Sequence, residues 1–249
     1  MIDIHSHIIF GVDDGPSTMS QSINMIKEAE RLGIGLIVAS PHYHETIYDL
    51  KCVEENYKEL LYRARDYEVA INLGYEVFAN PENQTLIKNR KTLYMSKSGV
   101  ILFEFPFNAI PQKCIEMIYN FRLQKITPVI AHVERNRAFL NRVEYFVAFL
   151  KAGCYIQVDA GSIVGVYGSK IKEFTKKLLK MNLVDMVASN AHCAADYVSW
   201  YSQAYKNVSQ WIGKEEASIL FHDNAKNILE NRSTEDLTYR NILGRERLI

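Results

Sequence analysis

Histidines and acidic residues stand at or just beyond the ends of short apolar runs along this 249-residue sequence. Five of its seven histidines occupy such positions. The candidate set also includes the two aspartates of the "GVDDGP" loop and one asparagine. Its members are His5, His7, Asp13, Asp14, His42, Glu76, Glu104, His132, Asn190 and His192. Imidazole and carboxylate groups are ligands for Zn²⁺, Mn²⁺ and Fe²⁺, and a His-x-His pair leaving a strand can bring both rings to one ion. The residue types therefore predict a metal centre.

Each part of this pattern also has an ordinary structural explanation. A His-x-His pair is common as surface or hydrogen-bonded structure, "DDGP" is a usual turn before a helix, and Glu104 in "LFEFP" could be an exposed edge residue. A carboxylate buried inside "VILFEF" would, however, be unfavourable without a cation or hydrogen-bond donors. The joint pattern favours the metal site over a separate explanation at each position.

Seven Val- and Ile-rich runs alternate with segments of helical periodicity, which is typical of βα units around a parallel sheet. The predicted strands are "IDIH", "GLIVAS", "VAINLGYEV", "VILFEF", "TPVIAHV", "CYIQVDA" and "VDMVAS". A helix is expected after Ser17, as its N-cap, with a stop at Gly33. In a parallel barrel the carboxyl ends of the strands share one face, so His5 and His192 would meet there. Periodicity alone leaves an open doubly wound sheet as the alternative.

Composition limits the class of protein. The 29 basic and 29 acidic residues leave no net charge, which disfavours nucleic acid or an anionic membrane as a partner. The four cysteines form no C-x-x-C pair, "MIDIHSH" is unlike a secretory signal, and every apolar run is far shorter than the roughly 20 residues of a membrane helix. We expect a cytoplasmic protein with a single domain over residues 1–230 and a polar C-terminal tail over residues 231–249.

Six segments, taken in order, resemble the motifs of the polymerase and histidinol phosphatase superfamily. They are "MIDIHSHIIFGVDDGPSTMSQS", "SPHYH", "GYEVF", "LFEFP", "TPVIAHVERN" and "VASNAHC". The closer resemblance is to the manganese-dependent protein-tyrosine phosphatases of Gram-positive capsule and exopolysaccharide operons. It implies an α/β fold, a distorted (β/α)7 TIM-like barrel, with three divalent metal ions. Manganese is the expected metal, with iron and zinc as alternatives.

The resemblance also implies a role for each candidate residue. The first metal would be held by His5, His7, Glu76 and the residue at 190, the second by Glu76, Glu104 and His132, and the third by Asp14, His42 and His192. The implied substrate is phosphotyrosine on a bacterial tyrosine autokinase of the polysaccharide machinery, hydrolysed by a metal-bridging hydroxide. Arg135 and His42 are the expected catalytic residues. The Arg135 guanidinium would grip phosphate oxygens, whereas the alternative is an exposed arginine paired with Glu134.

Two positions depart from the family pattern. Asn190 stands where relatives carry an aspartate, so acidic ligands would number three instead of four, and the first metal is expected to bind more weakly. "CAADYVSWY" after His192 contains no arginine, although relatives place one there for phosphate, and Tyr197 is one candidate to fill its space. The alternatives are therefore a phosphoesterase for a small phosphomonoester, or a phosphotyrosine-binding variant of low activity. A homo-oligomer is compatible with the sequence.

Overall fold

The structure of this chain, a computed structural model, describes residues 1–44, 49–95, 99–140 and 142–230. The predicted tail, residues 231–249, lies outside the described residues. The strands are β1 (Ile2–Ser6), β2 (Leu36–Ala39), β3 (His42–Tyr43), β4 (Ala70–Leu73), β5 (Glu76–Phe78), β6 (Val100–Glu104), β7 (Thr127–Ile130), β8 (Tyr155–Asp159) and β9 (Met186–Ala188). All pairings between these strands are parallel, as the alternation of strand and helix patterns predicts.

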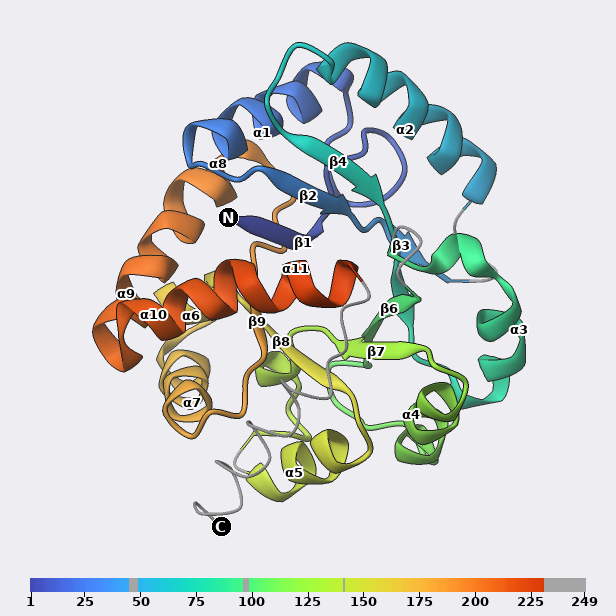
Figure 1. The fold of residues 1–249 in the computed structure, drawn as a ribbon, viewed down its shortest axis with the longest axis vertical. Helices are drawn as coiled ribbons and strands as arrows, with labels where there is room; N and C mark the ends of the chain where they lie inside the picture. Colours follow the sequence, from blue (N-terminus) through green and yellow to red (C-terminus); the bar gives the residue numbers. More distant parts are fainter. Residues whose placement is uncertain (45–48, 96–98, 141, 231–249) are drawn as a thin grey trace.

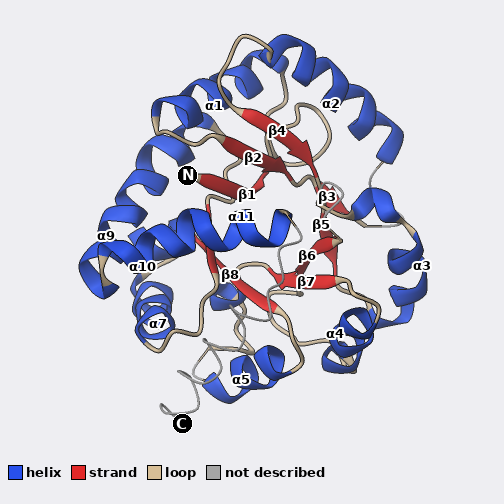
Figure 2. Ribbon diagram, in the orientation of Figure 1, coloured by secondary structure: helices blue, strands red, loops and turns tan. Residues whose placement is uncertain are grey.

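Helices surround the strands on the outside (Figures 1 and 2). The α-helices are α1 (Met19–Arg31), α2 (Leu50–Ala64), α3 (Gln84–Asn89), α4 (Cys114–Leu123), α5 (Val143–Lys151), α6 (Ala160–Val164), α7 (Ser169–Lys180), α8 (Ala194–Asp196), α9 (Ser202–Ile212), α10 (Lys214–Ser218) and α11 (Asn224–Leu229). Short 3₁₀ segments are η1 (Pro81–Asn83), η2 (Lys91–Leu93) and η3 (Val133–Arg135), and π-helical turns are η4 (Tyr197–Tyr201) and η5 (Ile219–Asp223). Across the described ranges, no helix combines the length and apolarity needed to cross a bilayer.

The strands curl into a ring that returns to its starting strand. β1, β2 and β4 form one sheet, and β3, β5, β6, β7, β8 and β9 form the other. The two sheets are continuous in the chain, because β3 follows β2 and β5 follows β4 after short breaks. At these breaks, Glu76 N donates a hydrogen bond to Pro41 O at 3.0 Å. On the other side, β9 reaches β1 through His7 N to Ala191 O and Asn190 N to His5 O, both 2.9 Å. The predicted distorted (β/α)7 barrel is confirmed, and all seven predicted runs form strands.

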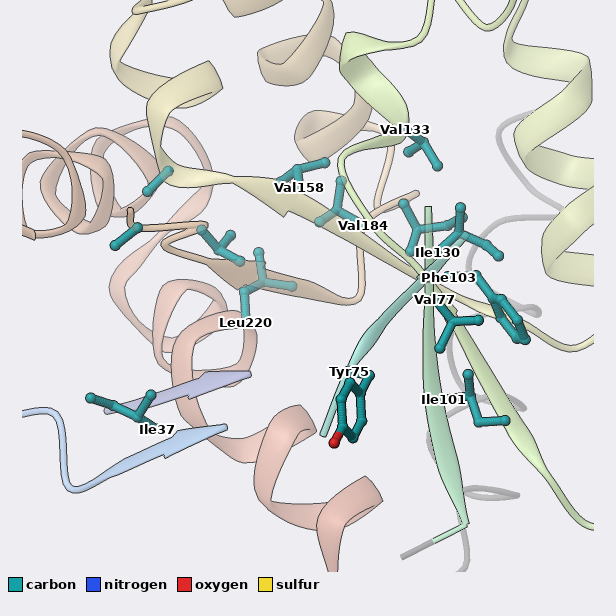
Figure 3. Close-up of a cluster of buried hydrophobic side chains, with 14 of the residues drawn as sticks. Ile37, Tyr75, Val77, Ile101, Phe103, Ile130, Val133, Val158, Val184 and Leu220 are labelled. Atoms are coloured by element: carbon teal, nitrogen blue, oxygen red, sulfur yellow. The ribbon is translucent and has the colours of Figure 1, made fainter. Parts of the chain in front are cut away.

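Both faces of this sheet are buried. Along β6, Val100 and Leu102 belong to a core inside the ring, to which Ala225 and Ile228 of α11 also belong. Helix α11 covers one end of the ring (Figure 1). The alternate residues of β6 pack outward against the helices, in the larger core of which Figure 3 shows a part. Parallel strands buried on both faces are usually continuous apolar runs, so most polar ligands are expected at or near the strand ends.

The N-cap of α1 is Thr18, so the prediction of Ser17 was wrong by one residue. Thr18 has an extended backbone, and its hydroxyl accepts from Gln21 N at 3.4 Å, while the Gln21 side chain accepts from Thr18 N at 3.1 Å. The Ser17 hydroxyl instead donates to the side chain of Gln21. Gly33 ends the helical segment as predicted, in a left-handed conformation with φ +75°.

Replacing Thr18 by alanine is expected to lower the free energy of unfolding by about 1 kcal/mol, because one amide at the start of α1 loses its acceptor. Urea denaturation of the two proteins at constant metal concentration measures the difference. Ser17→Ala is the matched control and should have a clearly smaller effect. Equal losses in the two variants would show that the cap is shared and not centred on Thr18.

Candidate metal centre

The predicted ligand residues gather around one carboxylate, that of Glu76 at the start of β5. Its side chain is 1% exposed. Oε2 lies 3.3 Å from His5 Nε2, 3.3 Å from His7 Nε2 and 3.1 Å from His42 Nδ1, and Oε1 lies 2.6 Å from His132 Nε2. Burial alone would raise the pKa of Glu76, but the charges of His5 and His132 hold this pKa well below its usual value. Glu76 is thus an ionised carboxylate among four imidazoles.

The two histidines of the His-x-His pair point ring nitrogens at the same place. His5 Nε2 and His7 Nε2 are 3.3 Å apart, while His5 Nδ1 lies 3.0 Å from Gln157 Oε1 and His7 Nδ1 lies 2.7 Å from Asp13 Oδ2. A neutral imidazole that donates from Nδ1 keeps a lone pair on Nε2. Two such lone pairs facing each other fit a cation between them, since metal–nitrogen bonds are about 2.1 Å long.

His7 also shows that protons and metal compete at this place. Burial lowers the pKa of His7, but the hydrogen bonds to Asp13 and Glu76 outweigh burial and raise this pKa to about 9 in the metal-free protein. A ring that binds a cation must release this proton from Nε2. Asp13 remains bound to Nδ1 in either case, so it fixes the orientation of the ring.

The two aspartates of "GVDDGP" have different partners. Asp13 turns inward and accepts from His42 N at 3.1 Å and from Gly15 N at 3.0 Å. Asp14 is 64% exposed at the rim, with Oδ1 3.2 Å from His192 Nε2 and 3.5 Å from His42 Nε2. Hydrogen bonds from His192 and His42 lower the pKa of Asp14. The loop allows this approach because residue 15 is glycine: a Cβ there would collide with the carbonyl oxygen of His7.

Three groups of side chains in the described residues have donor atoms close enough to share an ion. They are His5, His7 and Glu76; His42, Glu76 and Glu104; and His7, Asp14, His42 and His192. All of the predicted histidine and carboxylate ligands except His132 fall in these groups, and His132 contacts the second oxygen of Glu76. Glu104 Oε1 lies 3.2 Å from His42 Nδ1. The suggestion that Glu104 is an exposed edge residue is wrong, because it is 17% exposed and β6 lies between β5 and β7.

The Asn190 side chain, next to β1, is buried, and only one end of its amide group has a hydrogen-bond partner among the described residues. Its side-chain Nδ2 donates to Asp159 Oδ2 at 3.0 Å, and its Oδ1 has no hydrogen-bond partner among the described residues. An unpartnered buried acceptor needs an explanation, and a cation at the first metal position would provide one. The backbone of Asn190 is left-handed, with φ +49°, as is that of His132, with φ +34°. Such conformations are uncommon outside glycine and often occur at functional sites.

Asp159, which ends β8, was missed at the sequence level. It is fully buried, and it accepts from Arg135 Nη1 at 2.9 Å as well as from Asn190. Burial alone would raise the pKa of Asp159, but the charges of His132 and Arg135 lower it. The available signal was its position, since "CYIQVDA" is the one predicted strand to which no ligand had been assigned, and Asp159 stands at its carboxyl end.

Arg135 lies beside the centre and is not an exposed arginine paired with Glu134, so that alternative is wrong. Its side chain is 19% exposed and lies over the rings of Tyr167, at 4.1 Å, and Phe107, at 5.0 Å. Glu134 is fully buried and accepts from Ser162 and from Asp159 N. Burial and the charge of Asp159 raise the pKa of Glu134 to about 7.

Tyr197, one candidate for the space of the arginine expected after His192, belongs to the buried core. The Tyr197 ring is fully buried, and its hydroxyl lies 2.8 Å from Asp3 Oδ2 and 3.0 Å from Ser6 Oγ. It therefore anchors the start of η4 to β1. Among the described residues, Arg135 provides a cation next to the predicted ligands, through its contact with Asp159.

Comparison with known proteins gives a family match along most of the chain. Residues 1–230 match the family model described as capsular polysaccharide synthesis, CpsB/CapC. The tyrosine-protein phosphatase CpsB of Streptococcus agalactiae is 32% identical over 240 residues, which cover 93% of this chain and 99% of the relative. The tyrosine-protein phosphatase YwqE of Bacillus subtilis is 31% identical over 237 residues, which cover 94% and 93%.

Solved structures agree with this match. A chain from the crystal structures of YwqE from Bacillus subtilis and CpsB from Streptococcus pneumoniae, described as unique metal-dependent tyrosine phosphatases, has a TM-score of 0.86 and 32% identity, with 94% of this chain and 96% of that chain covered. Histidinol phosphate phosphatase from Lactococcus lactis, complexed with zinc, L-histidinol and phosphate, has a TM-score of 0.56 and 12% identity, with 89% and 94% covered. At this lower identity the second match shows a shared fold.

Proposed function

Because this chain belongs to the CpsB/CapC family of capsular polysaccharide synthesis, we propose that it is a metal-dependent protein-tyrosine phosphatase. The observation that carries the proposal is the ionised Glu76 carboxylate within 3.3 Å of four histidine rings. Buried carboxylates are usually neutralised by one partner, and four imidazoles are more than neutralisation needs. Shared cations explain the arrangement.

We assign three divalent ions to the centre, with manganese as the physiological metal. The mixture of imidazole nitrogens and carboxylate oxygens suits Mn²⁺, and it would also accept Fe²⁺ or Zn²⁺. The first position would use His5, His7, Glu76 and Asn190; the second Glu76, Glu104 and His132; and the third Asp14, His42 and His192. When bound, these ions would neutralise the phosphoryl oxygens and activate a water molecule.

The side chains around the ions support an aryl phosphate as the substrate. Arg135 uses Nη1 for Asp159, and a guanidinium has five N–H donors, so it can also bind phosphoryl oxygens. Phe107 is 47% exposed, and its ring lies 6.0 Å from that of His132 with an angle of 24° between the planes. A phenyl ring that enters beside the phosphate could pack on Phe107, which a small alkyl phosphate would not do.

The substrate that we propose is a phosphotyrosine-bearing tyrosine kinase of the polysaccharide machinery. The family and its named tyrosine phosphatases support this class of partner. We assign the activity to residues 1–230, leave the polar tail of residues 231–249 outside it, and place the protein in the cytoplasm, where free cysteines are usual.

The deciding experiment is hydrolysis of a phosphotyrosine peptide by the purified full chain, with added Mn²⁺ and with a chelator. Chelation is expected to reduce the rate by roughly 100-fold or more, because the ions contribute several kcal/mol to stabilising the transition state. Excess Mn²⁺ should restore the rate. A rate that chelation leaves unchanged would overturn the proposal.

Two further arms separate the alternatives. Histidinol phosphate and glycerol phosphate are offered under the same conditions, and faster turnover of either would favour a phosphoesterase for small substrates. Binding of the phosphotyrosine peptide without turnover, measured by calorimetry, would favour a binding protein of low activity.

A further inference from the structure

We propose that Asp159 and Asn190 act as one acidic unit, in which Asp159 supplies the carboxylate that position 190 lacks and positions the Asn190 amide for the first metal. This inference rests on the metal centre of the proposed function. It assigns Asp159 as a positioning residue of that centre and predicts that one carboxylate is needed in the pair, at either position.

The direction of the Asn190 amide is determined by Asp159. The amide has a donor end and an acceptor end, and only the NH₂ group can face a carboxylate favourably. Because Nδ2 lies 3.0 Å from Asp159 Oδ2, Oδ1 is the end turned away from Asp159. This oxygen is buried and unpartnered among the described residues, as expected for an atom whose partner is a cation.

A second path connects Asp159 to the same metal position. Gln157 Nε2 donates to Asp159 Oδ1 at 3.0 Å, and Gln157 Oε1 lies 3.0 Å from His5 Nδ1. All three side chains are fully buried. Asp159 therefore orients two expected ligands of the first metal, Asn190 directly and His5 through Gln157. Partners of this kind commonly determine metal affinity through ligands that they do not replace.

The charge of the centre changes when Asp159 is included. The expected acidic ligands are Asp14, Glu76 and Glu104, against a nominal six positive charges on three dications. Asp159 provides a fourth carboxylate, within hydrogen-bond distance of Asn190, the one amide among the expected ligands. The expectation of a weakened first metal site counted only the residue at 190, and it did not include the neighbouring strand. Arg135 shares the charge of Asp159, which links the same carboxylate to the proposed phosphate-binding cation.

A reciprocal exchange of the two residues tests the pair. Two aspartates would place like charges about 3 Å apart in a buried site, so Asn190→Asp alone is expected to lower the melting temperature of the metal-free protein by roughly 5 °C or more. Asp159→Asn alone leaves two asparagines and no carboxylate in the pair. This variant is expected to weaken Mn²⁺ affinity by about 10- to 100-fold. The double variant again contains one aspartate and one asparagine. Its melting temperature and its Mn²⁺ affinity should therefore both return towards those of the unaltered protein.

The measurements are melting temperature in chelator and Mn²⁺ binding by calorimetry, with metal content after dialysis as a third readout. Asp185→Asn is the matched control: Asp185 is buried in the loop before β9 and accepts from Ile156 N at 2.8 Å. This variant should lose stability but bind Mn²⁺ like the unaltered protein. If Asp159 were merely structural, Asp159→Asn would behave like this control and Asn190→Asp would not rescue it.

Wild-type Mn²⁺ affinity in Asp159→Asn, or a double variant as weak as Asp159→Asn, would overturn the inference. Failure of the proposed function is distinguishable, because it would appear as absent or chelator-insensitive hydrolysis by the unaltered protein. The binding and melting experiments do not depend on that activity.

Discussion

Replacing Glu76 by glutamine is expected to reduce phosphotyrosine hydrolysis by roughly 1,000-fold or more. Glutamine has nearly the same shape, but it is neutral and has one acceptor oxygen where the carboxylate has two. In the structure, the two oxygens of Glu76 serve His132 on one side and His5, His7 and His42 on the other. Ions held there contribute several kcal/mol to the rate, and about 4 kcal/mol corresponds to roughly 1,000-fold.

The variant should also lose metal. Glu76 is common to two of the three groups of potential ligands, so its neutralisation weakens two positions at once. Steady-state kinetics at saturating Mn²⁺, together with metal content by plasma emission, measure both effects. Glu82→Gln is the matched control, because Glu82 is an exposed glutamate on the neighbouring 3₁₀ turn η1. Normal rate and metal content in Glu76→Gln would contradict the central position of this carboxylate.

The location of the centre was predictable because it depends on a regularity of the fold. Apolar runs mark the strands, parallel strands place their carboxyl ends on one face, and polar residues that follow such runs must then converge. His5 and His132 are more than 120 positions apart in the sequence, yet both lie against Glu76. The resemblance to a family added the division into three metal positions, which residue types alone could not provide.

The features that were missed depend on pairings between side chains of different strands. Asp159 looks like the ordinary end of a strand until Asn190 and Arg135 are placed against it. No local pattern contains these contacts, because they depend on which strands are neighbours and on the rotamers that the surrounding core allows. The same applies to Tyr197, whose helical position is visible in the sequence but whose buried bond to Asp3 is not.

Backbone details were missed for a related reason. "GLIVAS" and "VAINLGYEV" were each predicted as one strand. The structure breaks the ladder after the first run, so that β3 is a separate strand, and within the second run, which is divided into β4 and β5. Gly74 lies at one of these breaks, where a Cβ would approach Val38 Cγ1 at 3.0 Å. A single glycine in an apolar run indicates a close approach or a bulge, but the sequence does not show which neighbour is close. The break places Glu76 at the beginning of a new strand.

Replacing Arg135 by lysine is expected to lower kcat/KM for a phosphotyrosine peptide by about 100-fold, similar to the loss of one donor that stabilises charge in a transition state. The guanidinium is planar and lies over the rings of Tyr167 and Phe107. Lysine retains the positive charge, but its ammonium group cannot stack on aromatic rings as a planar group or donate two parallel hydrogen bonds to a pair of oxygens. Alanine would be a poorer test, because it would leave Asp159 buried without its cation and would alter the metal centre as well.

Lysine at this position should therefore separate phosphate binding from metal binding. Since the charge opposite Asp159 remains, Mn²⁺ content is expected to stay at the level of the unaltered protein while kcat/KM falls. Arg137→Lys is the matched control, because Arg137 is an exposed arginine two positions along the same loop, and this variant should keep full activity. If Arg135→Lys lost metal in proportion to activity, Arg135 would act through Asp159 and not on the phosphate. An unchanged kcat/KM would exclude the residue from both roles.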